Sequence, residues 1–135
     1  MMTSRGIRNN NPGNIRKSAK WQGLAADQTD PAFCVFSRPE YGIRALCRIL
    51  RTYQRKHGLR DVRSIINRFA PPVENDTESY IYSVCLKLDV KPDTLIDLQE
   101  TGIMLNMLKA IIKHENGVQP YTDKQLLNGI KLEEA

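Results

Sequence analysis

The stretch 98–117 constrains the fold most, because it joins a helical pattern to a clear end point. Its apolar side chains recur at helical spacing: Met104, Leu108, Ile111 and Ile112. The pattern predicts an amphipathic helix over about residues 98–115, which Gly117 stops. Continued by one more turn, the apolar stripe reaches Glu115, so a carboxylate occupies a position that the pattern assigns to an apolar side chain.

Glu115 is therefore the first candidate for a reactive group. Partial burial disfavours its charged form, and the negative end of the helix dipole disfavours that form again. A carboxyl group in such a place keeps its proton near neutral pH and suits general acid catalysis. The simpler interpretation is a glutamate that bends out to solvent, helped by Lys113 and His114.

Four further segments show helical spacing, separated by Gly and Pro breakers: about 38–57, 62–70, 78–88 and 122–130. The first two carry these apolar side chains: Ile43, Leu46, Ile49, Leu50, Tyr53, Val62, Ile65, Ile66 and Phe69. Ser37 and Glu40 have the spacing of a capping box, and Thr122 and Gln125 repeat it. Residues 131–135 are expected to fray.

The N-terminal segment 5–16 is dominated by turn formers. Short extended pieces near Ile15 and at 33–36 are expected to pair as a small β-hairpin. The sequence thus predicts one domain over residues 1–135, mainly α (α+β), with about five helices.

Charge is divided unevenly along the chain. Residues 1–68 hold 14 Lys/Arg and 4 Asp/Glu, whereas residues 69–135 hold 6 and 11. The basic half favours attraction to a polyanion, either nucleic acid or an anionic bacterial envelope. A merely solvated helix face is the alternative, since the basic residues are spread through helical pattern.

Other features exclude several classes of protein. No run of 18 apolar residues predicts a membrane span, and no apolar segment near the start predicts a secretory signal. Three cysteines without metal-ligand spacing predict reduced thiols, and neither metal nor cofactor is expected. A nucleophilic pair of Cys34 with His114 is an alternative catalytic hypothesis, whereas Cys47 and Cys85 fit the core.

Several motifs resemble a family of small phage and prophage proteins that are described as virion-associated or lysozyme-like. They are RGIRNNNPGNIR at 5–16, WQG at 21–23, FSRPEYGIRAL at 36–46 and APPVENDT at 70–77. The resemblance covers about residues 5–117 and implies a lysozyme-like fold.

A second resemblance is to flagellar-type N-acetylglucosaminidases and related peptidoglycan hydrolases. Their catalytic glutamate ends an apolar helix first, and the other motifs follow it. Here the similar pieces come in rotated order: NNPGNIR at 10–16, WQG at 21–23, FCVFS at 33–37, NDTESY at 75–80 and finally IIKHENG at 111–117. The rotated order implies a circularly permuted lysozyme-like domain, with Asn116 in place of the usual serine.

The resemblance implies cleavage of the β-1,4 bond of peptidoglycan, as muramidase, glucosaminidase or lytic transglycosylase. Glu115 would be the acid, and Tyr80 would lie near the scissile bond. The candidates for a second carboxylate are Asp30, Glu40, Glu74 and Asp76. The candidates for glycan binding are Asn10, Asn11, Asn14, Trp21 and Asn75. Turn formation explains the N-terminal asparagines equally well, core filling explains Trp21, and capping explains Glu40.

The rival class is a virion protein that binds nucleic acid or glycan without catalysis. Four arginines at helical spacing predict one basic stripe: Arg44, Arg48, Arg51 and Arg55. No stacking aromatics accompany the stripe, so nucleic acid is the weaker partner. A chain made in the cytoplasm would reach the wall through a pore, a phage tail or a secretion machine.

Overall fold

The computed structural model describes residues 3–73 and 75–135, and within them the chain is mainly helical. The described residues form six helices: α1 (Arg5–Arg8), α2 (Pro39–His57), α3 (Val62–Phe69), α4 (Thr77–Leu88), α5 (Thr101–Asn116) and α6 (Asp123–Glu134). The five helices predicted from apolar spacing are all present. The short helix α1 was not predicted, because its segment was assigned to turns.

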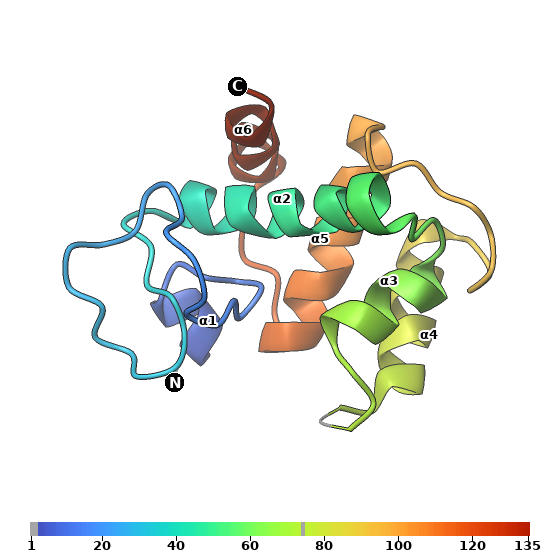
Figure 1. The fold of residues 1–135 in the computed structure, drawn as a ribbon, viewed down its shortest axis with the longest axis horizontal. Coiled ribbons are helices and arrows are strands. Elements are labelled where there is room, and N and C mark those ends of the chain that lie inside the picture. The colour runs from blue at the N-terminus through green and yellow to red at the C-terminus, as the bar shows by residue number, and fades with distance from the viewer. Residues whose placement is uncertain (1–2, 74) are drawn as a thin grey trace.

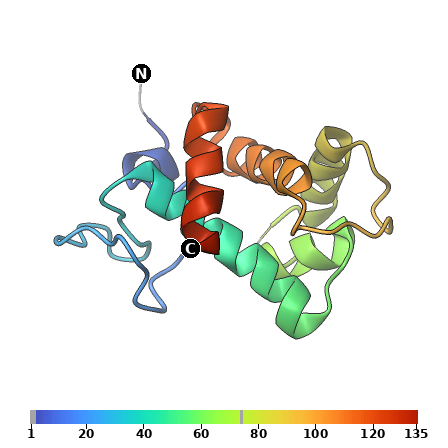
Figure 2. The ribbon, with the colours of Figure 1, turned by 90° about the horizontal axis from the view of Figure 1, so that it is seen from above.

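The long helix α2 crosses the molecule and organises the other elements (Figure 1). Helix α6 packs along one side of α2, while α5 lies on the other side and packs against α4. The N-terminal loops lie at one end of α2, and α3 and α4 lie at the other end (Figure 2). The C-terminal turn of α5 lies between the N-terminal loops and α3.

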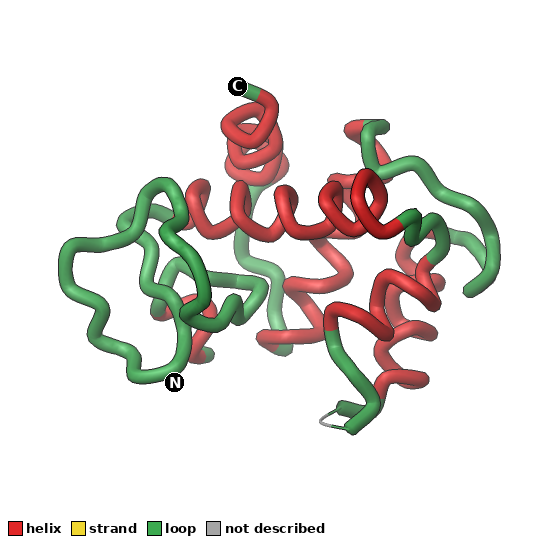
Figure 3. The backbone as a smooth tube through the Cα atoms, viewed as in Figure 1, coloured by secondary structure: helices red, strands yellow, loops and turns green. Residues whose placement is uncertain are grey.

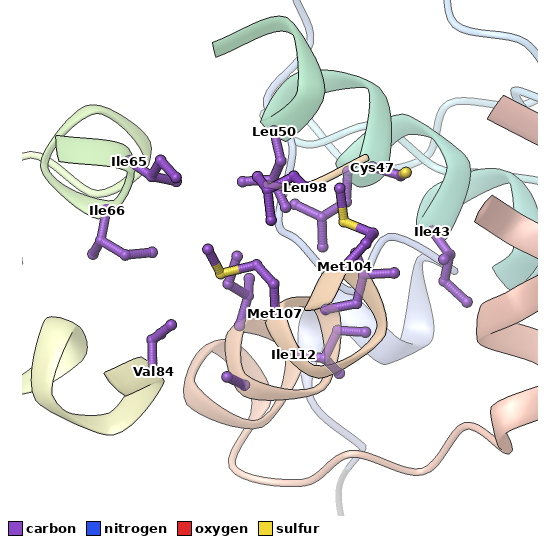
Figure 4. Packing of buried hydrophobic residues seen from close by; sticks show 14 of the residues in the cluster. Ile43, Cys47, Leu50, Ile65, Ile66, Val84, Leu98, Met104, Met107 and Ile112 are labelled. Carbon is purple, nitrogen blue, oxygen red and sulfur yellow. The ribbon is translucent and has the colours of Figure 1, made fainter. Parts of the chain in front are cut away.

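One continuous core holds these helices together. Leu50 of α2 lies beside the α5 methionines Met104 and Met107, whereas Ile43 and Cys47 lie on the side of α2 toward α6, and α3 and α4 close the far side (Figure 4). All of these side chains are buried. None of the helices in the described residues combines the length and the apolar character that a membrane span requires.

The helix boundaries follow from local chemistry. Gly58 and Gly117 end α2 and α5 in the left-handed conformation, with φ of 64° and 76°. The capping box of Thr122 and Gln125 is confirmed. The capping box predicted at Ser37 is wrong: the Ser37 hydroxyl donates to the carbonyl of Gly23, and the N-cap of α2 is Arg38 without a side-chain cap.

The predicted β-hairpin does not form among the described residues (Figure 3). Two isolated antiparallel bridges, Arg16 with Phe33 and Leu24 with Phe36, replace it. The polar segment between these bridges runs as turns and bends, so backbone pairing does not extend into a ladder. Side chains supply the missing order, chiefly buried Asn11, whose amide bonds to the backbone of Ile15 and Cys34.

Two expectations about charged residues at the α2–α6 contact are also wrong. Helix α6 continues to Glu134, because Glu133 is buried and accepts a 2.8 Å bond from Arg51. Arg51 has only 1% of its side chain exposed, and Arg48 also pairs with Glu133. The four arginines of α2 therefore do not form one exposed stripe, since part of that face packs on α6.

Candidate active site

Glu115 lies in the last turn of α5 and is held by two side chains that are distant in sequence. The amide Nδ2 of Asn14 donates to its Oε1 at 3.0 Å. The hydroxyl of Tyr80 donates to its Oε2 at 2.9 Å. The structure thus brings together an N-terminal loop, α4 and the end of α5 at one carboxyl group.

The N-terminal loop presents Asn14 through a particular backbone conformation. Asn10 and Asn14 both have φ of 52°, in the left-handed region that asparagine tolerates better than most side chains. The loop is fixed from within, because the backbone amide of Asn14 bonds to the carbonyl of Asn11 at 3.0 Å. Turn formation and contact with Glu115 are therefore combined in Asn14.

Tyr80 reaches Glu115 from inside the protein. Only 1% of its surface is exposed, and its ring stacks on His114 with 3.8 Å between ring centroids. Burial, together with the nearby negative charge of Glu115, raises the pKa of Tyr80 above its ordinary value. The hydroxyl therefore stays protonated at neutral pH and remains a donor.

Asn116 locks the N-terminal segment onto the end of α5. Its Nδ2 donates to the carbonyl of Pro12 at 2.8 Å, and its Oδ1 accepts from the hydroxyl of Ser4 at 2.7 Å. The space beside it is tight: a Cβ added to Gly6 would lie 2.5 Å from Asn116 Oδ1. Asn116, which follows Glu115 in sequence, therefore holds the Asn14 loop in place.

Glu115 lines a cavity of about 800 Å³. The described lining residues are Gly13, Asn14, Ile15, Arg16, Ser18, Phe33, Ile49, Tyr53, Phe69, Ala70, Pro71, Asn75 and Glu115. Besides Glu115, this lining includes three aromatic rings, three polar side chains and one arginine. Within this described lining, Glu115 is the one carboxylate.

The other predicted glycan-binding residues are distributed differently. Asn75 lines the cavity, with its amide bonded to the carbonyl of Pro71. Asn10 donates to the carbonyl of Phe36, and Asn11 is fully buried, so both serve the loop itself. Trp21 packs against the core outside the described cavity lining.

The candidate second carboxylates lie elsewhere or are already engaged. Asp30 accepts two 2.6 Å bonds from Arg5, and these hydrogen bonds hold the pKa of Asp30 well below its usual range. Glu40 lies in the first turn of α2 beside Arg38, outside the described cavity lining. Asp76 caps α4 by accepting from the backbone of Ser79. Glu74 lies outside the described residues.

Within the described residues, no hydrogen bond joins Cys34 to His114, and each has another partner. Burial raises the pKa of the Cys34 thiol, which lies 3.6 Å from the carbonyl oxygen of Arg16, and His114 is engaged with Tyr80. No cluster of three or more metal-ligating side chains occurs in this described part of the chain.

Sequence reasoning missed part of the cavity wall. The helical pattern placed Tyr53 and Phe69 on apolar faces, but it did not show that these rings would border an open cavity. Arg16 and Phe33 were considered as hairpin residues and as members of the quoted motifs, but neither was predicted to line a cavity. Their side chains form a cation–π pair with 5.0 Å between guanidinium carbon and ring centroid, a signal that spacing along the chain does not contain.

The protein is mainly helical, and it has a cavity lined by polar and aromatic side chains and by one glutamate, Glu115, within the described lining. No protein family model matches the chain. Over 132 residues it is 40% identical to "Protein P5" of Pseudoalteromonas phage PM2, a match that covers 95% of this chain and 81% of the phage protein. The chain therefore belongs to the family of phage PM2 Protein P5.

Proposed function

We propose that this protein cleaves the β-1,4 glycosidic bond of peptidoglycan, with Glu115 as general acid. The observation that carries the proposal is the position of Glu115 at the cavity wall, held by Asn14 and Tyr80. Both donors are neutral, and Glu115 forms no ion pair within the described residues. The rotated order of the site segments supports the hypothesis of a circularly permuted lysozyme-like domain.

Asn14 and Tyr80 bond to different oxygens of the Glu115 carboxyl group. Asn14 Nδ2 can only donate, so Oε1 remains an acceptor. The Tyr80 hydroxyl can donate or accept, so it remains bonded to Oε2 before and after proton transfer. Together they fix the plane of the Glu115 carboxyl group relative to the cavity, and fixed geometry is what general acid catalysis needs.

The bond-breaking step follows from this arrangement. Glu115 gives its proton to the glycosidic oxygen, the bond from that oxygen to the anomeric carbon breaks, and positive charge develops on the sugar ring. The described lining contains no second carboxylate, which favours attack by the substrate's own 6-hydroxyl group. Glu115, now ionised, takes the proton of that hydroxyl, and the product is a 1,6-anhydro sugar.

The test is digestion of purified peptidoglycan, with the soluble fragments identified by mass spectrometry. Anhydro ends indicate a transglycosylase, reducing muramic acid a muramidase, and reducing glucosamine a glucosaminidase. A protein that releases no fragments would refute the enzymatic proposal and leave the rival, a phage structural or glycan-binding protein. Membership in a phage protein family supports delivery to the wall on a virion for either class.

A further inference from the structure

Two arginines at the cavity carry charge that nothing else in the described residues neutralises. Arg16 lines the cavity and lies over the ring of Phe33. Arg68 of α3 lies over the ring of Tyr53, with 5.3 Å between guanidinium carbon and ring centroid, and Tyr53 also lines the cavity. Neither arginine forms an ion pair within the described chain, whereas nearby Arg5 is paired with Asp30.

Each of these guanidinium groups lies over an aromatic ring that lines the cavity. A guanidinium group has five N–H donors, so a contact with one aromatic side chain leaves donors for a ligand. Such a group suits an oxyanion, since its planar fork matches the two oxygens of a carboxylate. Arg16 and Arg68 are both exposed, so a ligand can reach them from solvent.

The two arginines come from different elements beside the cavity. Arg16 comes from the N-terminal loops and lines the cavity, whereas Arg68 comes from α3 and borders the cavity through the ring of Tyr53. The end of α5, whose last turn carries Glu115, lies between these elements (Figure 1). A ligand strand bound at Glu115 and extended toward both elements meets a guanidinium group from each. The anions carried along a peptidoglycan strand are the free carboxylates of the peptide stems on its muramic acid residues.

We infer that Arg16 and Arg68 select glycan strands that carry peptide stems, by pairing with stem carboxylates on both sides of the bond to be cleaved. This inference rests on the proposed function for the identity of the strand. It names a requirement that general acid catalysis does not impose, because an acid alone would cleave bare and stem-bearing glycan equally.

The experiment compares intact glycan strands with the same strands after their stem carboxylates have been converted to amides by carbodiimide coupling to ammonia. Binding is measured by co-sedimentation in a Glu115→Gln background, so that cleavage does not disturb the equilibrium. We expect about tenfold tighter binding to strands with free stem carboxylates, and we expect Arg16→Gln and Arg68→Gln each to remove much of that preference. The matched control is Arg55→Gln, an exposed arginine on α2 about half a helical turn away from Tyr53.

Cleavage kinetics separate this inference from the proposed function. With Glu115 present, Arg16→Gln should raise KM for intact strands and leave kcat nearly unchanged, as expected for a lost binding contact. Equal cleavage of both strand types, equal binding of both, or no binding of either would overturn the inference. A preference for stems that depends on Arg16, in a protein that releases no fragments, would support the inference and refute the proposed catalysis.

Discussion

Asp30 and Glu115 are two carboxylates that hold the N-terminal loops, and they are treated in opposite ways. Asp30 accepts from five donors: Arg5 Nε, the second guanidinium nitrogen Nη2, Asn9 Nδ2 and the backbone N–H groups of Ala32 and Phe33. Glu115 accepts from two neutral donors, Asn14 and Tyr80. A carboxylate offers about four lone-pair positions, so Asp30 is saturated whereas Glu115 keeps acceptor capacity for a ligand.

The difference shows that the two carboxyl groups have different surroundings. A cation and a full set of donors hold the pKa of Asp30 well below its usual range, and Asp30 organises a loop. Glu115 has two neutral donors and lines an open cavity. Burial alone would not make this distinction, because both groups are at least partly buried.

The largest effect is expected from Glu115→Gln. If Glu115 is the acid, its loss should lower peptidoglycan cleavage by about 10²–10⁴-fold, the usual contribution of general acid catalysis. Fragment release per unit time measures the effect, and circular dichroism verifies the fold. The matched control is Glu100→Gln, which changes an exposed glutamate at the other end of the same helix. If the Glu115 variant cleaves at the wild-type rate, Glu115 is not the acid, and the proposed contrast with Asp30 is wrong.

Asp30→Asn should instead act on stability, because it leaves Arg5 without its carboxylate. We expect the melting temperature to fall by roughly 5 °C or more, with cleavage lost only as the protein unfolds. The lowered pKa of Asp30 also sets a pH dependence. Its contribution is present above the unfolded pKa of about 4 and is lost as pH falls below that value.

Thermal unfolding at a series of pH values tests this sign. The wild type should lose stability below about pH 4, and Asp30→Asn should show a flatter profile in the same range. Arg5→Gln is the partner variant, since it removes the same ion pair from the other side. Parallel profiles for wild type and variant would show that Asp30 is not the saturated anion described above.

Tyr80→Phe should have a moderate effect, confined to catalysis. It removes the donor to Glu115 Oε2 but keeps the buried ring and its stack on His114. We expect cleavage to fall roughly tenfold and stability to fall by about 1 kcal/mol. The rate of fragment release and the urea midpoint measure the two effects. A large loss of stability without a change in the rate would place Tyr80 with Asp30 as a structural group.

The smallest effect is expected from Tyr121→Phe. The Tyr121 hydroxyl is buried and has no hydrogen-bond partner within the described residues, and burial raises the pKa of Tyr121 to about 12. Removing an unsatisfied hydroxyl group should leave stability unchanged or raise it by about 1 kcal/mol. Cleavage should stay at the wild-type rate. This variant isolates the contribution of the bond to Glu115, because it makes the same chemical change to a tyrosine without that bond.

The helical part of the fold could be predicted because its causes are local. Apolar spacing set the faces of α2 to α6, and Gly58 and Gly117 set two of the ends. The cap predicted at Ser37 failed because that hydroxyl bonds to Gly23, which lies 14 residues earlier. Local rules rank cap residues, but they do not include a partner brought in by tertiary structure.

The site was less accessible to the same reasoning. The position of Glu115 follows from the period of its helix, but its contact with Asn14 spans 101 residues. No periodicity encodes such a contact. The hairpin prediction near Ile15 had the right neighbours, since Arg16 bridges Phe33, but it did not foresee that buried Asn11 would replace the strand ladder.

The hydrogen bonds of Asn116 have a consequence for the time course of folding. They tie α5 to Pro12 and Ser4, across separations of 104 and 112 residues. A nascent chain emerges with its N-terminus first, so the Asn14 loop cannot contact Asn116 until nearly the whole chain has been made. Closing so long a loop costs entropy before any contact compensates for it, which slows the step. We therefore expect the helices to form early and the Glu115 cavity to close last.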